Sequence, residues 1–201
     1  MTDTLPTAPE TTDRGSGFAA VAAGLLLFAS VAAELLRPVQ RPDGTVTDLP
    51  GFLVCASLWT VGAAALAVAI HGLGGRFGRA ISLAGAGLLT AFGATGLVTT
   101  MASGAPAEQS FLLFALGLLL LALGAVPFGL GLRFRLGGWW TAIPVSGLGA
   151  AVALLAEADP WHDLGLFVFD GAWMALGLRL LAGAADREQI PRRFGNPPPV
   201  S

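Results

Sequence analysis

Residues 111–132 read FLLFALGLLLLALGAVPFGLGL, a stretch of 22 residues without a charge. The hydrocarbon core of a bilayer is about 30 Å thick, and roughly 20 helical residues cross it. Strands of a membrane β-barrel are shorter and alternate between polar and apolar residues, and this stretch shows no such alternation. It therefore predicts a transmembrane helix.

Five other stretches have a similar length and polarity, and away from their ends only Asp170 and Arg179 carry charge. The segments between them are short, so neighbours in sequence are expected to pack as antiparallel hairpins. The sequence predicts an all-α, polytopic transmembrane helix bundle of six spans. These spans are residues 17–36, 52–72, 80–101, 111–132, 139–157 and 164–184.

Two tails are expected outside the six-helix domain of residues 17–185. Residues 1–16 are rich in Thr, Pro and Asp and cannot bury an apolar face, which predicts a disordered tail. Residues 186–201 end in three consecutive prolines and predict a second tail. One alternative concerns the first span, because Val31-Ala32-Ala33 would suit a signal peptidase; the preceding segment, however, lacks a net positive charge.

Composition excludes several classes of protein. The 201 residues include 11 basic residues, all Arg, and 13 acidic ones, so charged residues make up 12% of the chain and hydrophobic ones 54%; the mean hydropathy is +0.72. Soluble domains carry about twice that share of charge. A soluble enzyme is excluded on this ground, and so is a nucleic-acid partner, because no basic patch could neutralise a run of phosphates.

The arginines predict the orientation of the chain. Positive residues favour the cytoplasmic side of a membrane, and in a six-span arrangement nine of the 11 arginines fall on one side. Both termini are therefore expected to be cytoplasmic. Usage rich in Ala, Gly and Leu, with Arg but no Lys, indicates a bacterial source, and we expect a multi-pass protein of the bacterial inner (plasma) membrane. The nine arginines are Arg14, Arg76, Arg79, Arg133, Arg135, Arg179, Arg187, Arg192 and Arg193.

The scarcity of Cys and His argues against metal and cofactor chemistry. Cys55 is the single cysteine of the chain, so no disulfide framework forms within it. His71 and His162 are expected on opposite sides of the membrane, which disfavours a two-histidine metal or haem site. The acidic segment 157–163 offers carboxylates beside His162, but its spacing matches no metal motif and a solvated loop is the simpler interpretation. No metal, cofactor or catalytic residue is predicted.

Asp170, Glu34 and Trp173 are the candidate substrate- or ion-binding residues. Ionisable groups inside a bilayer are costly, by about 2.5–3.5 kcal/mol at its centre, and are often functional. Asp170 either binds a proton, a cation or a polar substrate, or makes a structural hydrogen bond to a neighbouring helix. Glu34 either shares a cavity with Asp170, if the first and last spans are neighbours, or pairs with Arg37 at the surface. Trp173 either lines that cavity or packs in the core.

Small residues predict how the helices pack, since close approach of backbones drives helix association in lipid. The span 80–101 carries two rows of small residues four positions apart, one including Ser82 and the other Gly87. We expect this span and 139–157 to be central, and 111–132 to face lipid. Pro144 is expected to bend the fifth span.

Three functions remain open. The first is a small transporter or ligand-binding membrane protein with an outward-facing cavity near Asp170. The second is a non-catalytic scaffold or partner subunit, which would bind another membrane protein through small-residue helix faces as well as the lipid bilayer. The third is an intramembrane enzyme acting on a lipid or isoprenoid-like substrate, with Asp170 as the acid and Glu34 stabilising positive charge.

Overall fold

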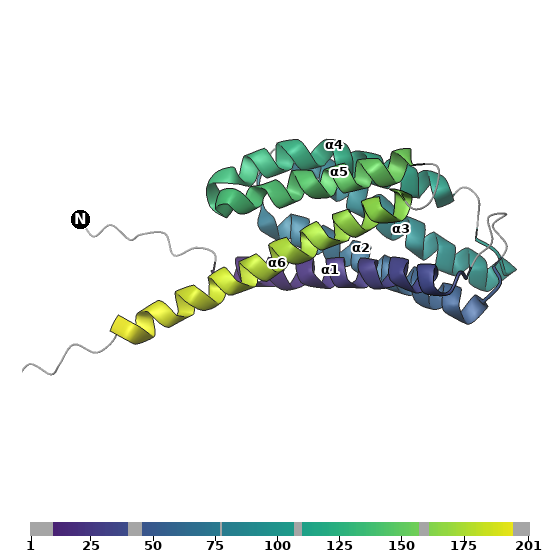
Figure 1. Ribbon diagram of the computed structural model, residues 1–201, viewed down its shortest axis with the longest axis horizontal. Helices are drawn as coiled ribbons and strands as arrows, with labels where there is room; N and C mark the ends of the chain where they lie inside the picture. The colour runs from purple at the N-terminus through teal and green to yellow at the C-terminus, as the bar shows by residue number, and fades with distance from the viewer. Residues whose placement is uncertain (1–9, 40–45, 77, 107–109, 157–160, 195–201) are drawn as a thin grey trace, which may run out of the picture.

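The computed structural model of the chain describes residues 10–39, 46–76, 78–106, 110–156 and 161–194, and no β-strand occurs among them. Six α-helices run along the long axis of the molecule (Figure 1), and one 3-10 helix joins the fourth to the fifth. The elements are α1 (Glu10–Leu36), α2 (Leu49–Leu73), α3 (Arg79–Ser103), α4 (Ser110–Leu136), η1 (Gly137–Thr141), α5 (Ala142–Leu155) and α6 (Trp161–Phe194). The predicted all-helical class is confirmed.

The helices form a closed ring. Each packs against its neighbours in sequence, and α1 packs against α6 to complete the circle. Neighbours are antiparallel: Ser30 near the end of α1 donates a hydrogen bond to the carbonyl of Cys55 near the start of α2, whereas Gly72 near the end of α2 lies against Ser16. The first and last helices are thus neighbours, which was the condition for a cavity shared by Glu34 and Asp170.

Five stretches are long and apolar enough to cross a membrane, judged by length and composition among the described residues. This makes the chain compatible with a multi-pass integral membrane protein. The fourth stretch, Phe111–Leu155, contains α4, η1 and α5 and folds back on itself, because Gly129 of α4 meets Pro144 of α5 and Ala125 meets Gly147. The other four are Arg14–Leu36, Leu49–Leu73, Arg79–Ser103 and Trp161–Ala185.

The fifth expected span differs from the sequence prediction. In place of a helix over residues 139–157, α5 has only 14 residues, and η1 precedes it. Gly137 takes a positive φ of 56°, a conformation that ends the α-helix of α4 at Leu136. Pro144 is the third residue of α5, directly after the change from 3-10 to α-helix, and α5 continues from it to Leu155 without a break.

Both ends of the domain are more helical than expected. The first helix begins at Glu10, so residues 10–16 are helical and do not belong to a tail; acidic residues such as Glu10 favour a helix N-terminus through the helix dipole. At the other end α6 continues to Phe194 and extends beyond the rest of the bundle (Figure 1). The tail predictions for residues 1–9 and 195–201 lie outside the described residues.

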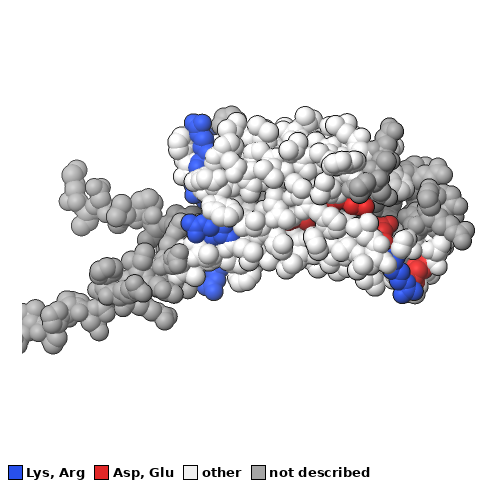
Figure 2. All heavy atoms as spheres, in the orientation of Figure 1, with Lys and Arg blue, Asp and Glu red and all other residues white. Residues whose placement is uncertain are grey.

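Charge separates the two ends of the bundle (Figure 2). We call the end where α2, α4 and α6 begin the acidic end, since Glu34, Asp48 and Asp163 belong to it. Arg37 is also there and pairs with Asp48 at 3.1 Å. We call the opposite end the basic end. The arginines near this end of the bundle include Arg14, Arg76, Arg79, Arg133 and Arg135.

Glycines set the closest helix contacts. A methyl group added at Gly85 of α3 would lie 2.8 Å from the carbonyl oxygen of Gly117 in α4, and one added at Gly78, next to α3, would lie 2.5 Å from that of Gly124. The predicted row through Gly87 faces outward instead, with no atom within 4 Å of the added methyl position. Thus α3 is one member of the ring and not central, while the other predicted row faces inward, with Ser82 and Ala86 buried.

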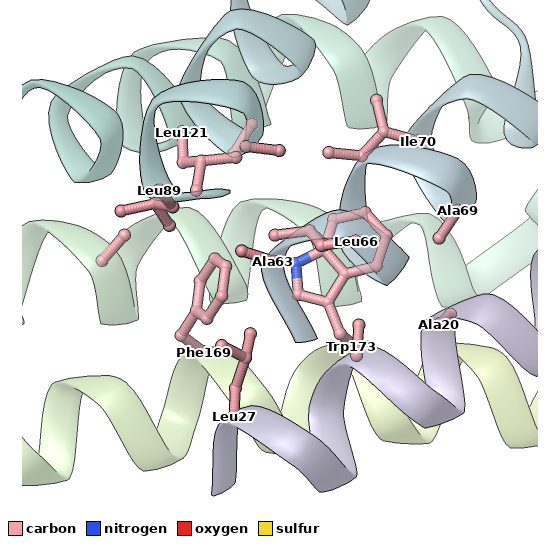
Figure 3. Packing of buried hydrophobic residues seen from close by; sticks show 14 of the residues in the cluster. Ala20, Leu27, Ala63, Leu66, Ala69, Ile70, Leu89, Leu121, Phe169 and Trp173 are labelled. Atoms are coloured by element: carbon pink, nitrogen blue, oxygen red, sulfur yellow. The ribbon is translucent and has the colours of Figure 1, made fainter. Parts of the chain in front are cut away.

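The prediction that the fourth span faces lipid was also only half right. Leu118 and Leu121 of α4 are buried in the core, whereas Leu119 is exposed. The two sides of the helix therefore differ, as they must in a ring where every helix has one inner and one outer face. Figure 3 shows part of the core, which includes Trp173 and Phe169 of α6 and Leu66 of α2.

Candidate functional site

Asp170 lies in the interior of the bundle. It is 1% exposed, and its backbone carbonyl meets α1 at Gly24, where an added methyl group would lie 2.5 Å from the oxygen. Nine residues separate it from Trp161 at the start of α6, which corresponds to about 14 Å along the helix. The 25-residue candidate span Trp161–Ala185 has Trp173 at its midpoint, so Asp170 is close to the centre.

The carboxyl of Asp170 has no hydrogen-bond partner among the residues that the structure describes. Its Oδ2 atom is buried and accepts no hydrogen bond, and no salt bridge or hydrogen bond of this side chain is observed among the described residues. The structural interpretation of Asp170 required a hydrogen bond to a neighbouring helix, such as one from a Ser or Thr. Ser146, the buried serine of α5, donates instead to the carbonyl of Ile143 at 2.7 Å.

Trp173 adds an unpaired donor on the same helix face. It is 3% exposed, and its Nε1 atom is buried without an acceptor. Residues three apart on a helix are surface neighbours, so the indole N–H and the Asp170 carboxyl belong to one region of the interior. Figure 3 shows the Trp173 ring within the core, toward Leu66 of α2. Asp170 and Trp173, two of the three predicted site residues, therefore share one face of α6.

Glu34 lies elsewhere. It is exposed near the end of α1, ten residues beyond Gly24, the residue that meets Asp170. Ten residues of helix correspond to about 15 Å along the axis. The contact between the rings of Phe28 and Phe167, whose centroids are 4.8 Å apart, fixes the same register between α1 and α6. Glu34 thus belongs to the acidic end and not to the region around Asp170.

A cluster of aromatic side chains, which the sequence did not single out as a group, lies in the half of the bundle toward the acidic end. The ring of Phe114 in α4 has its centroid 5.6 Å from that of Trp59, 5.2 Å from that of Phe92 and 6.0 Å from that of His162. These four residues come from four helices. We call them the aromatic cluster. Trp59 resembles Trp173 in having a buried Nε1 without a partner.

His162 has a defined structural role. Its Nδ1 atom lies 2.7 Å from the carbonyl oxygen of Ala153 in α5. A carbonyl only accepts hydrogen bonds, so Nδ1 is the donor and the ring joins α6 to α5. His71 lies at the basic end, where its Nδ1 accepts from Arg79 at 2.8 Å. The two histidines therefore lie at opposite ends, as predicted.

Among the described residues, no group of three His, Cys, Asp or Glu side chains is arranged to hold a metal ion. Most of the acidic segment beside His162, residues 157–160, lies outside the described residues. The chain matches no known family model, and neither the curated proteins nor the solved structures contain a match. Function must accordingly be inferred from the site itself.

The unpaired polar atoms of Asp170 and Trp173 indicate which ligands would fit the interior around them. Oδ2 lacks a donor and the indole of Trp173 lacks an acceptor, and each unsatisfied buried polar group costs about 1–3 kcal/mol. A small polar ligand that donates to the carboxyl and accepts from the indole would satisfy both. A proton or a cation would satisfy the carboxyl alone.

Proposed function

We propose that this protein is a small transporter or ligand-binding protein of the bacterial inner membrane, in which Asp170 and Trp173 hold a small polar or cationic substrate. The observation that carries the proposal is the buried, unpaired Oδ2 of Asp170 near the middle of a membrane-length helix. A charged group in such a place is rare because it is costly, and it is retained where it binds something.

The proposal includes six passes with both termini in the cytoplasm. The antiparallel contact between Gly129 and Pro144 supports separate passes of α4 and α5. The arginines of the basic end support a cytoplasmic location for that end. Asp170 then lies nearer to the outward-facing side, in agreement with an outward-facing site.

The two other functions have weaker support. The enzyme hypothesis needs two acids on one substrate, and Glu34 is about 15 Å along α1 from the level of Asp170. The scaffold hypothesis is favoured by one observation, the exposed face of α3 at Ala84 and Gly87, where small residues would admit a second helix. Replacement of Gly87 by Leu would then change the oligomeric state measured by light scattering, and an unchanged state would contradict it.

The substitution Asp170→Asn tests the proposed site. The two side chains have nearly the same shape, and Oδ2 makes no hydrogen bond that Asn would lose. We expect the variant to express normally and to melt in detergent within about 2 °C of the parent. We also expect native mass spectrometry to detect a bound small molecule on the parent but not on the variant, and we expect the variant to fail to complement a deletion strain.

The matched control is Glu34→Gln, which removes the other candidate acid from the surface of α1. It should retain both ligand and complementation. Loss of folded protein in Asp170→Asn would indicate a structural role for the carboxyl. Full complementation by that variant would contradict the proposal directly.

A further inference from the structure

Unpaired polar atoms are distributed unequally between the two halves of the bundle. Beside Asp170 and Trp173, the buried side-chain atoms without a partner in the described part of the chain are Nε1 of Trp59, Oγ1 of Thr100 and Nε of Arg79. Arg79 is the first residue of α3, is partly exposed, and so lies at the surface of the basic end. The other two belong to deeply buried residues, with Trp59 8% and Thr100 1% exposed.

These atoms lie at successive depths below the acidic end. Thr100 is three residues from the end of α3 at Ser103, about 5 Å along the axis. Trp59 is ten residues from the start of α2, about 15 Å. Asp170, about 14 Å from the start of its own helix, lies at a similar depth, with Trp173 one turn further in.

Open space accompanies this series. Gly96 is on the buried face of α3, one turn from Thr100, yet no atom lies within 4 Å of the position that a Cβ would occupy there. Buried polar groups of this kind are normally satisfied by internal water where there is room for it. Water in a membrane-spanning bundle is confined to such polar interior regions.

The basic half offers no comparable route. The buried side chains of α2 beyond Leu66 are Ala69, Ile70 and Leu73, all apolar and fully buried. Phe128 and Leu132 of α4 continue this apolar core. Nothing polar and unpaired is found among the described interior residues between this core and the basic end.

We propose that the acidic half of the bundle contains a water-filled vestibule, lined by Trp59, Gly96 and Thr100, that connects Asp170 with the acidic end only. This inference rests on the proposed function, for which it specifies the route to the site and its preference for cations. The described residues of the acidic end include three carboxylates, those of Glu34, Asp48 and Asp163, against the single guanidinium of Arg37. Protons and small cations are therefore attracted to its mouth, and anions are repelled.

The chain contains its own probe of this vestibule. Cys55 lies on the buried face of α2, one turn from Trp59 toward the acidic end. We expect two membrane-impermeant methanethiosulfonates of similar size to modify it in the folded, detergent-solubilised protein, as measured by intact mass. The trimethylammonium reagent should react roughly tenfold faster than the sulfonate, which corresponds to about 1.4 kcal/mol.

The double variant Cys55→Ser/Ala69→Cys is the matched control, because it moves the thiol along the same buried face of the same helix. Residue 69 is four residues from the basic end of α2, whereas Cys55 is six residues from the acidic end. The new thiol is thus nearer to an end, and we expect it to remain unmodified until the protein is unfolded.

The substitution Gly96→Leu tests the route itself. A leucine would fill the space beside Thr100, so modification of Cys55 should slow about tenfold at an unchanged melting temperature, whereas Gly87→Leu on the outer face of α3 should have no effect. Asp170→Asn should leave Cys55 modification unchanged, even if it removes ligand binding. The vestibule is contradicted if Cys55 reacts only after denaturation, if the thiol at 69 reacts equally fast, or if only a membrane-permeant maleimide reaches Cys55.

Discussion

The α3–α4 and α1–α6 contacts follow the same pattern, except that Asp170 replaces one of the glycines. Between α3 and α4, Gly78 meets Gly124 and, seven residues along each helix, Gly85 meets Gly117. Between α1 and α6, Gly17 meets Gly177, and seven residues along each helix, Gly24 meets Asp170. Asp170 thus occupies the position that a glycine holds in the other contact.

The comparison shows that the close approach of α1 and α6 does not need the carboxyl group of Asp170. At Gly24 the close contact is with the backbone oxygen of Asp170, so this pair of helices approaches without help from the side chain. The α3–α4 contact achieves a similar approach with Gly117 at the matching position. The side chain of Asp170 has no partner among the described residues, so the close approach of the two helices does not account for its presence.

The largest expected loss of stability comes from placing a large side chain at the corresponding glycine of each contact, Gly24 in α1–α6 and Gly85 in α3–α4. Leucine at Gly24 or at Gly85 would place atoms within 3 Å of the backbone of the partner helix, so the two helices would have to separate. We expect each variant to lose more than about 3 kcal/mol of stability. Thermal melting followed by fluorescence-detected size exclusion would measure the loss.

Leucine at Gly87 is the control for this prediction, because it lies on α3 two residues from Gly85 but faces outward. Its melting temperature should match that of the parent. If Gly24→Leu melted like Gly87→Leu, the α1–α6 contact would not be as close as the α3–α4 contact, and the similarity between the two would be lost.

A smaller change in stability is expected when the α1–α6 contact is given the same residues as the α3–α4 contact. The substitution Asp170→Gly gives α1–α6 the glycine that α3–α4 has. Removing an unpaired buried carboxyl relieves a cost, whereas the lost side-chain volume and the flexibility of glycine add costs of about 1 kcal/mol each. We expect a folded protein whose melting temperature differs from the parent by only a few degrees. Unfolded or aggregated material would show that the carboxyl supports the fold.

The smallest effect concerns the exposed end of α1. Arg37 pairs with Asp48 at 3.1 Å, but the arginine side chain is 79% exposed. Ion pairs at the surface contribute about 0–1 kcal/mol, so Arg37→Gln should change stability by less than about 0.5 kcal/mol. Melting at low and high salt would check this, and a shift as large as that of Asp170→Gly would contradict it.

Much of the fold follows from the lengths of the uncharged stretches. They predicted the helical class, and short connections predicted antiparallel neighbours. The glycine contacts were missed because small residues were read in rows of four, whereas the contacts of Gly78 with Gly124 and Gly85 with Gly117 recur every seven residues. A row of small residues also does not indicate which side of its helix faces inward. The row through Gly87 lies on the outer face of α3.

The site was predictable only in part. Asp170 stands out because a carboxylate amid apolar residues is unusual in any sequence, and Trp173 lies one turn away on the same helix. The location of Glu34 relative to Asp170 could not be predicted, because it follows from the register between α1 and α6, which depends on tertiary packing at Gly24. The aromatic cluster joins Trp59, Phe92, Phe114 and His162 from four helices, and no local spacing relates residues so far apart in the chain.

The short turn between α4 and α5 has a consequence for biogenesis. Only η1, five residues long, separates the two helices, and α5 with its 14 residues extends about 21 Å, less than the thickness of the hydrocarbon core. Inserted alone, α5 would be too short to cross the hydrocarbon core. We expect α4 and α5 to be inserted together as a helical hairpin, so that the strongly apolar α4 carries its shorter partner into the bilayer.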